Sequence, residues 1–352
     1  LQSELTLDGD INFSSLFNFR INVSRSNRRY TDNRYWKSGF DINGSTTNLA
    51  GSSSFLNQKN RNVILSGSYG FGFGRIEFVN HAWVAVQMLQ ALQDNGELQR
   101  RLSQDDIKEL ADLIGTVSRQ RILDARMRDI EVLETIIDYL KEKNVIENTS
   151  TRAILITEDV YEFDRIMTRL SGSRLEFSLN PSWNYARTIQ SFQDLTGTTL
   201  GLRGEIVYEN HTNYDTHWSR EVRWIASIDL FKRGNNRDRG GAFVVGEIEE
   251  EIIPQLGYEF TYRYTPGLRT NLSLTVKPSF RTKIIVLEDN SVEFNPTDFL
   301  VNAEFRYNYF LSPHSQFIVY SNLTYNDATF QSGRYNAILS ANMGFGFSHF
   351  IY

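Results

Sequence analysis

Histidine and serine stand two residues apart in His217-Trp218-Ser219, which places both side chains on one face of an extended strand. Glu221 follows on the same face. A histidine beside a serine hydroxyl can act as a general base for a nucleophile, so this segment is the chain's candidate for nucleophilic catalysis. The simpler interpretation is a strand end at which Trp218 has polar neighbours. We favour that interpretation, expect no enzymatic activity and assign no catalytic residue.

Two further groups of residues have the chemistry of metal ligands. His211, Asp215 and His217 lie in one turn, and an acidic run extends from 247 to 251. The first set would suit a transition metal and the second Ca²⁺. Two histidines six apart and a run of glutamates are more simply explained as solvated segments. The chain has no cysteine, so thiolate ligands and disulfides are excluded. We therefore predict no metal site and no cofactor.

The elements that carry these residues alternate apolar and polar side chains with a period of two. The stretch from 299 to 311 is typical, with Phe305 and Tyr307 on one face and Glu304 and Arg306 on the other. This period predicts β-strands with two unlike faces. The segments are longer than ordinary globular strands and rich in aromatic residues. These features favour a transmembrane β-barrel over a soluble sandwich, and no apolar run is long enough for a transmembrane helix.

The period changes twice along the chain and divides it into three parts. Residues 1–79 read as N-terminal barrel strands, 80–171 as a helical insertion, and 172–352 as C-terminal barrel strands. In the middle part, apolar stripes through Ile107, Leu110 and Ile114 and through Ile130 and Ile137 indicate helices. Ser103 with Asp106 predicts an N-cap. The opposite helix faces are strongly charged, so we expect these helices to lie in water.

The lengths of the connections predict the topology. Segments 265–268 and 312–314 are short, whereas 233–253 is the longest connection of the C-terminal part. If the chain end lies in the periplasm, as in barrels of this kind, the helical insertion lies there too. Counting strands gives about eight in the C-terminal part and about four in the N-terminal part. We therefore predict a mainly β protein, a closed antiparallel transmembrane β-barrel of about 12 strands with an inserted periplasmic α-helical domain.

The polar strand face of such a barrel points into the lumen, and we expect its charged residues to lie there. Both signs are present, so the lumen is either a salt-bridged plug or a narrow, hydrated and somewhat basic pore. The predicted lumen-facing charged residues are Arg20, Glu176, Arg203, Glu205, Arg223, Asp229, Glu259, Arg263, Lys277, Arg281, Lys283, Glu304 and Arg306.

With its alternating aromatic strands, long polar loops and final Phe350-Ile351-Tyr352, the sequence resembles Gram-negative outer-membrane β-barrel proteins. In that class the last strand carries an assembly signal that ends in an aromatic residue, with another aromatic two positions earlier. Phe350 and Tyr352 match it, although Phe347 stands where a glycine is usual. The resemblance implies a place in the cell outer membrane and contact with its lipid and with the barrel assembly machinery.

The arginines of the predicted 233–253 loop allow two interpretations. Arg233, Arg237 and Arg239 can meet lipopolysaccharide phosphates or pair with the glutamates of the same loop. The slightly acidic chain, with a formal net charge of −5, gives no reason to expect nucleic acid as a partner.

Three functions follow from these patterns. We expect a structural subunit of an envelope complex, which docks other envelope proteins through its helical insertion, because a simple pore has no need of so long an insertion. The alternative is a porin-like channel for small polar or anionic solutes. A second alternative is an outer-membrane lipid hydrolase, since some of those enzymes resemble this chain in using His-x-Ser on a barrel strand. The strand count places residues 217–219 at the periplasmic end, which argues against it.

Overall fold

The structure is a computed structural model of the 352-residue chain. It describes residues 2–13, 16–49, 58–118, 125–146, 150–164, 168–190, 193–239, 242–267, 269–286, 291–312, 315–329 and 335–349. The strands are β1 (Gln2–Phe13), β2 (Leu16–Thr31), β3 (Arg34–Leu49), β4 (Gln58–Phe78), β5 (Leu170–Gln190), β6 (Gln193–Asn213), β7 (Trp218–Arg239), β8 (Ala242–Gly267), β9 (Thr270–Val286), β10 (Val292–Ser312), β11 (Ser315–Thr329) and β12 (Tyr335–His349). The helices are α1 (Asn80–Asp94), α2 (Gln104–Val117), α3 (Ala125–Glu142) and α4 (Thr151–Asp164).

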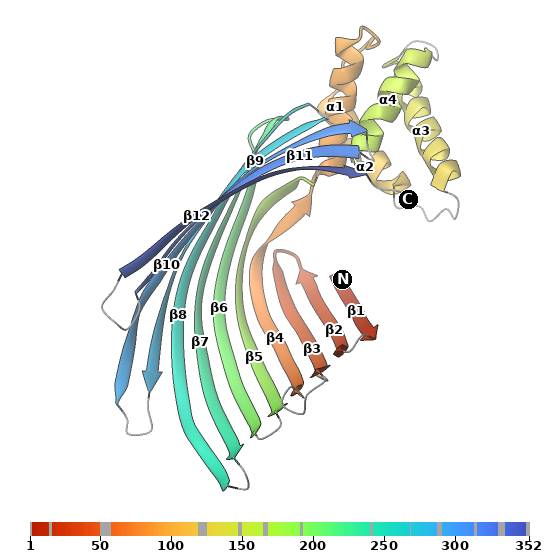
Figure 1. Cartoon of the computed structure of the whole chain (residues 1–352). Coiled ribbons are helices and arrows are strands. Elements are labelled where there is room, and N and C mark those ends of the chain that lie inside the picture. The colour runs from red at the N-terminus through yellow and green to blue at the C-terminus, as the bar shows by residue number, and fades with distance from the viewer. Residues whose placement is uncertain are drawn as a thin grey trace.

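The strands form one 12-stranded sheet in sequential order, from β1 to β12. Neighbouring strands are antiparallel throughout, and the sheet curves strongly (Figure 1). Strand lengths run from 12 residues in β1 to 26 in β8. Each strand is therefore at least about twice as long as the usual strand of about five or six residues. The predicted strand number and direction are confirmed.

The described strands leave the sheet with two edges. Among them, β1 pairs with β2 alone and β12 with β11 alone, and Figure 1 shows the two edges apart. The predicted closure between first and last strands is therefore not formed in this structure.

The predicted loop over 233–253 is wrong, because β7 and β8 run on as a hairpin. Strand β7 continues to Arg239 and β8 begins at Ala242. Lys232 Nζ lies 2.9 Å from Glu250 Oε1, and Arg233 Nη2 lies 3.3 Å from Glu251 Oε2. Charge pairs between the two strands replace the apolar alternation here. For Arg233, the structure agrees with the interpretation that this arginine pairs with the glutamates of the segment.

The four helices lie between β4 and β5 and pack around a core of their own. Ser103 is the N-cap of α2, as predicted, and Asp106 completes a capping box with it. In α3, Val132 and Ile136 are buried, whereas Ile130, which was expected in the apolar stripe, is mostly exposed. None of the described helices is long and apolar enough to cross a membrane.

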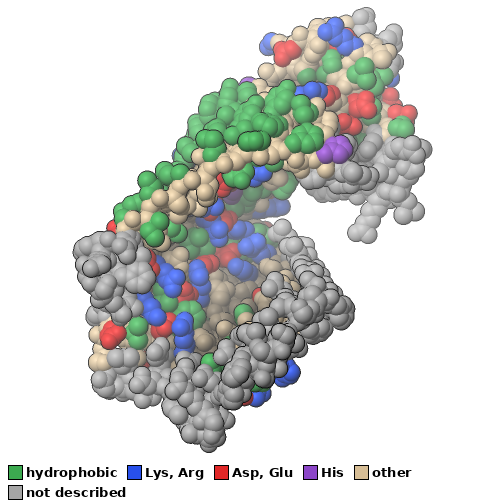
Figure 2. All heavy atoms as spheres, viewed as in Figure 1, with side chains coloured by type: hydrophobic (Ala, Val, Ile, Leu, Met, Phe, Trp, Pro, Cys, Tyr) green, Lys and Arg blue, Asp and Glu red, His purple; other side chains and the backbone are tan. Residues whose placement is uncertain are grey.

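The large apolar side chains of the sheet point outward and are exposed. In the sheet, the buried hydrophobic side chains among the described residues are Tyr35, Val207, Ile253 and Phe310. By contrast Met343 is 81% exposed and Phe345 82%. Figure 2 shows hydrophobic side chains covering the outer surface and charged ones gathered in the hollow. Such a surface is far too apolar for a water-exposed monomer.

Candidate functional site

The charged residues predicted for the lumen share one face of the sheet, which we call the polar face. Cross-strand pairing joins Arg203 to Asp229 and Arg223 to Glu259 in common rows, and the period of two places the others in parallel rows. For Arg20 only the strand position is described. Phe350 and Tyr352 of the predicted assembly signal lie outside the described residues.

Glu176 is the centre of a buried charge cluster on the polar face. Its Oε1 lies 2.7 Å from Lys37 Nζ, and its Oε2 lies 3.3 Å from Arg28 Nη2 and accepts a 2.8 Å hydrogen bond from the Tyr35 hydroxyl. The side chains of this cluster come from β2, β3 and β5, and they meet over β4. The cluster is possible because the position between Tyr35 and Glu176 in this row is Gly72, where a Cβ would meet the Tyr35 ring at 2.3 Å.

Most of the other charges on this face are paired with an opposite charge. Arg203 lies 2.9 Å from Glu205 and 3.6 Å from Asp229, and Lys277 lies 2.7 Å from Glu259. The further pairs are Arg223–Glu209, Arg174–Glu209, Arg263–Glu221 and Lys283–Glu251. Pairing across strands removes most of the cost of placing these charges on the wall of one hollow.

Three of the predicted residues have no ion pair among the described residues, namely Arg281, Glu304 and Arg306. Arg306 donates from Nε to Asn308 Oδ1 at 3.1 Å. The polar face therefore has unneutralised cations at two places on strands β9 and β10.

The candidate catalytic segment does not assemble a nucleophile with its base. His217 Nδ1 lies 3.2 Å from Thr216 Oγ1, and His217 and Trp218 donate their backbone N–H groups to Asp215. These two bonds lower the pKa of Asp215 below its ordinary value. Ser219 is buried on the polar face, in the same row as Arg263. Among the described residues, no hydrogen bond joins His217 to Ser219.

The candidate metal ligands are likewise dispersed. His211 Nδ1 lies 3.8 Å from Glu221 on β7, whereas His217 turns toward Asp215 at 4.0 Å. Within the described residues, no group of three or more histidine, aspartate or glutamate side chains is placed to hold a metal.

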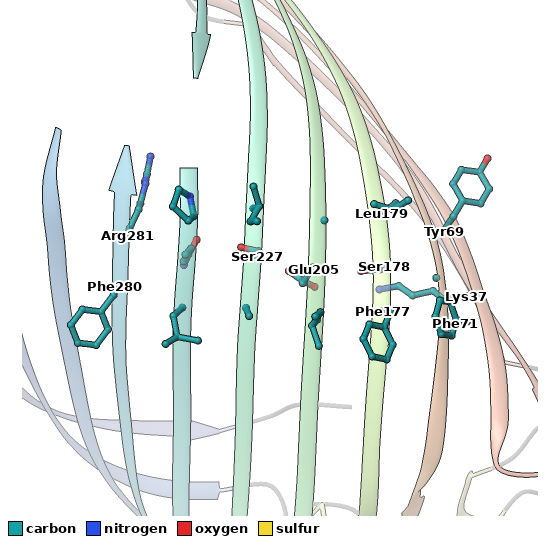
Figure 3. Close-up of a pocket in the computed structure, with 18 of the residues that line it drawn as sticks. Lys37, Tyr69, Phe71, Phe177, Ser178, Leu179, Glu205, Ser227, Phe280 and Arg281 are labelled. Atoms are coloured by element: carbon teal, nitrogen blue, oxygen red, sulfur yellow. The ribbon is translucent and has the colours of Figure 1, made fainter. Parts of the chain in front are cut away.

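A hollow of about 870 Å³ lies on the apolar outer face across β3 to β9. Phe71, Phe177 and Phe280 belong to one cross-strand row, and Gly204 and Ala226 leave the space between such bulky residues (Figure 3). Its lining is mainly apolar, so it suits hydrocarbon rather than a charged substrate.

The helices are fixed to one end of the sheet by a small set of contacts. Trp83 Nε1 of α1 donates to the Thr216 carbonyl at 2.8 Å, and the Arg169 guanidinium lies over the Trp83 ring at 4.8 Å. Arg169 also donates to Thr216 O at 2.7 Å and to Asp215 O at 3.2 Å. Burial lowers the pKa of Arg169 to about 10. Phe310 of β10 joins the helical core, so the helices and the sheet share buried contacts.

Several of these residues were missed from the sequence. Arg28, Lys37 and Tyr35 lie in the stretch whose alternation is weakest, and Arg169 lies between the helical and strand patterns. The available signal was the Gly-Phe alternation of residues 70–74. It shows that the polar face of this segment carries only glycines, which leaves room there for side chains from neighbouring strands.

The sheet and its two faces define the class of the protein. Long antiparallel strands in sequential order, an exposed apolar outer face and a charged inner face are the features of outer-membrane β-barrels. The predicted resemblance to that class holds, and the outer membrane is the location that this fold implies.

No family model matches the sequence, and no curated protein matches it. Among solved structures, it is similar to the translocator domain of the autotransporter NalP from Neisseria meningitidis, at 8% identity over 95% of this chain and 81% of that one, with a TM-score of 0.35. It is also similar to the β domain of the Bordetella autotransporter BrkA, at 9% identity over 99% and 97%, with a TM-score of 0.34. The ferric yersiniabactin uptake receptor FyuA from Yersinia pestis gives 7% identity over 90% of this chain and 44% of that one, with a TM-score of 0.37. At such scores, none of these similarities bears on what this chain binds or does.

Proposed function

We propose that the protein is an outer-membrane β-barrel that acts as a structural subunit of an envelope complex and presents its helices to a periplasmic partner. The observation that carries the proposal is the fixed attachment of a separately packed helical unit to one end of the sheet, through Trp83, Arg169 and Phe310. A rigid mount favours docking because little conformational entropy is lost when a partner binds.

The helical unit lies at the end of the sheet where β12 finishes and where the turn at 214–217 joins β6 to β7. In barrels with a periplasmic chain end, this is the periplasmic side. The direction of the strands thus supports the periplasmic placement of the helices.

The proposed docking surface is a groove of about 430 Å³ on α4. Leu155 is mostly exposed beside Ile156, while Glu158, Asp159 and Glu162 outnumber Arg152 and give the groove a mainly acidic rim. An exposed leucine within an acidic rim fits a protein segment that carries an apolar side chain between basic residues.

A photo-crosslinking residue at position 155 tests the docking proposal in intact cells. We expect a covalent adduct with one envelope protein, and we expect Glu158→Lys to abolish it by reversing the charge of the rim. The same crosslinker at Glu134, which is exposed on α3, is the control and should give no adduct. Equal adducts from both positions, or none from 155, would contradict the proposal.

The proposal includes closure of the barrel by pairing of β1 with β12. Hydrocarbon cannot satisfy the backbone N–H and C=O groups of a free edge, so an open sheet is not stable in a membrane. An even number of strands makes β1 and β12 antiparallel when they meet, which supports this closure.

Engineered disulfides test the closure, because the chain has no cysteine of its own. We expect Thr6→Cys to cross-link within one chain to one or two members of a cysteine series on the polar-face positions of β12 between Asn336 and Ser348. A cysteine at Asn302 on β10 is the control and should not react with it. If only intermolecular dimers form, the edges pair two copies instead.

A porin-like channel is the second candidate, and the unpaired Arg281 and Arg306 on the polar face favour it. Planar-bilayer recording distinguishes the two functions.

Deletion of 80–168, with β4 and β5 joined by a short turn, should leave a folded barrel that no longer gives the adduct. A large conductance that appears only after the deletion would show that the helices block a pore.

A further inference from the structure

A small polar cavity lies on the inner face where the sheet meets the helical unit. Its volume is about 260 Å³, and it is lined by residues from the helix exit and from β7, β8, β9 and β10. The lining consists of Thr168, Arg169, Ser219, Arg263, Thr265, Asn271, Ser273, Arg306 and Asn308. Three of these residues are arginines and none is a carboxylate.

The sheet register places two of the arginines on either side of a serine. Arg263 of β8 and Arg306 of β10 both pair with Ser273 of β9, and Ser219 of β7 extends the same row. Neighbouring strands lie about 4.8 Å apart, so the two arginine stems stand roughly 10 Å apart with a hydroxyl between them. Two like charges in one row repel each other unless an anion lies between them.

The hydrogen bonds of these arginines leave donors free toward the cavity. Arg263 uses Nη1 for Glu221, and Arg306 uses Nε for the neutral oxygen of Asn308. Arg169 donates hydrogen bonds to two backbone carbonyls and to Thr265 Oγ1, and all three acceptors are uncharged. Among the described residues, Glu221 is therefore the carboxylate that pairs with one of these three arginines, and that arginine is Arg263.

The remaining lining adds groups that suit an oxyanion. Ser219 and Thr265 are buried, and their hydroxyls can donate as well as accept. Asn271 Oδ1 is a buried acceptor that has no hydrogen-bond partner among the described residues. It suits the O–H of a ligand that is both anionic and hydroxylated. Two guanidinium forks together with hydroxyls supply more donors than a carboxylate's two oxygens can use, whereas a tetrahedral phosphate can use them.

We propose that this cavity is a phosphate-binding site at the junction of the sheet and the helices, in which Arg263 and Arg306 bind the oxyanion above Ser273 and Arg169 supplies further positive charge. The ligand class is inorganic phosphate or the phosphate group of a small ester. The volume leaves little room for a larger organic group. The site is built from the polar face and the helix exit, and it does not depend on the docking proposal.

Isothermal titration of the purified full chain in detergent, at constant ionic strength, tests the site with inorganic phosphate and with glycerol 3-phosphate. We expect saturable binding by the wild type and at least a tenfold weaker affinity in Arg306→Gln, with partial recovery in Arg306→Lys. Arg281→Gln is the control, because Arg281 lies on the same strand face eight residues along β9 from Ser273, about 26 Å away. It should bind as the wild type does.

The two probes separate the sources of the ligand. Tighter binding of inorganic phosphate assigns the site to the free ion, and tighter binding of the ester assigns it to an organic phosphate. Wild type that saturates with neither probe overturns the proposal, as does an affinity that Arg306→Gln leaves unchanged or that Arg281→Gln reduces equally. On denaturing gels, a band that migrates differently in unheated and heated samples verifies that each variant is a folded barrel.

Discussion

Glu176 has more partners than any other acidic side chain described on the polar face. Lys37 and Arg28 neutralise it and Tyr35 donates a hydrogen bond, and the four side chains come from three strands around Gly72. Such a cluster fixes the relative positions of β2, β3 and β5, because a one-residue shift would turn each side chain to the outer face.

We expect Glu176→Ala to destabilise the folded barrel by about 3–5 kcal/mol, since it leaves two cations partly buried without a counter-charge. Chemical unfolding in detergent, followed by tryptophan fluorescence, measures the change. Lys277→Ala is the control. The pair of Lys277 with Glu259 is far more exposed, so its loss should cost less than about 1 kcal/mol. Equal effects of the two changes would show that the Glu176 cluster has no special role.

At the scale of elements, α2 shows how the helical unit is joined internally. Asp106 completes the capping box with Ser103 and also lies 3.0 Å from Lys143, which follows α3. The Tyr139 hydroxyl of α3 donates to the Asp106 carbonyl at 2.9 Å. One carboxylate therefore caps a helix and binds the next helix to it.

The pH dependence of this joint follows from the pKa of Asp106. Its bonds to Ser103 and Lys143 lower that pKa from 3.8 to about 2, so its contribution to stability is complete above pH 4 and is lost as the pH falls through 2. We expect acid to loosen the helical unit between pH 4 and 2, as monitored by the environment of Trp83. Asp106→Asn should weaken the unit at pH 7 and flatten this transition. Asp138→Asn, on the exposed side of α3, should leave the transition unchanged.

At the scale of the whole molecule, the sheet is apolar outside and charged inside. The described hydrophobic core belongs almost entirely to the helices, while the sheet exposes aromatic and aliphatic side chains along its outer face. This division requires two solvents: hydrocarbon around the sheet, and water around the helices and in the hollow.

A charge on the outer face tests this arrangement. Phe305 is exposed on the outer face, whereas Asn302 lies on the polar face of the same strand. Phe305→Arg should impair membrane assembly by about 2–4 kcal/mol at a midplane depth, and Asn302→Arg should be tolerated. Folding into lipid vesicles measures both. Equal folding of the two variants, or good solubility without detergent, would contradict a membrane-spanning sheet.

The sequence by itself determined the class, an approximate strand number and the helical segment. These depend on periodicity, and a period of two or of about 3.6 is local information that survives without knowledge of neighbours. It also separated the two faces, so Arg203, Glu259 and Arg306 could be assigned to the polar face before their partners were known.

Only the tertiary structure decided which of these charges neutralise one another. Arg28 and Glu176 are far apart in the chain, and they meet because the register of four strands aligns them across Gly72. The same register places Arg263 and Arg306 around Ser273 and joins the Arg169 side chain to the turn at 214–217. Pairing between distant segments sets such positions, and a local pattern carries no information about register.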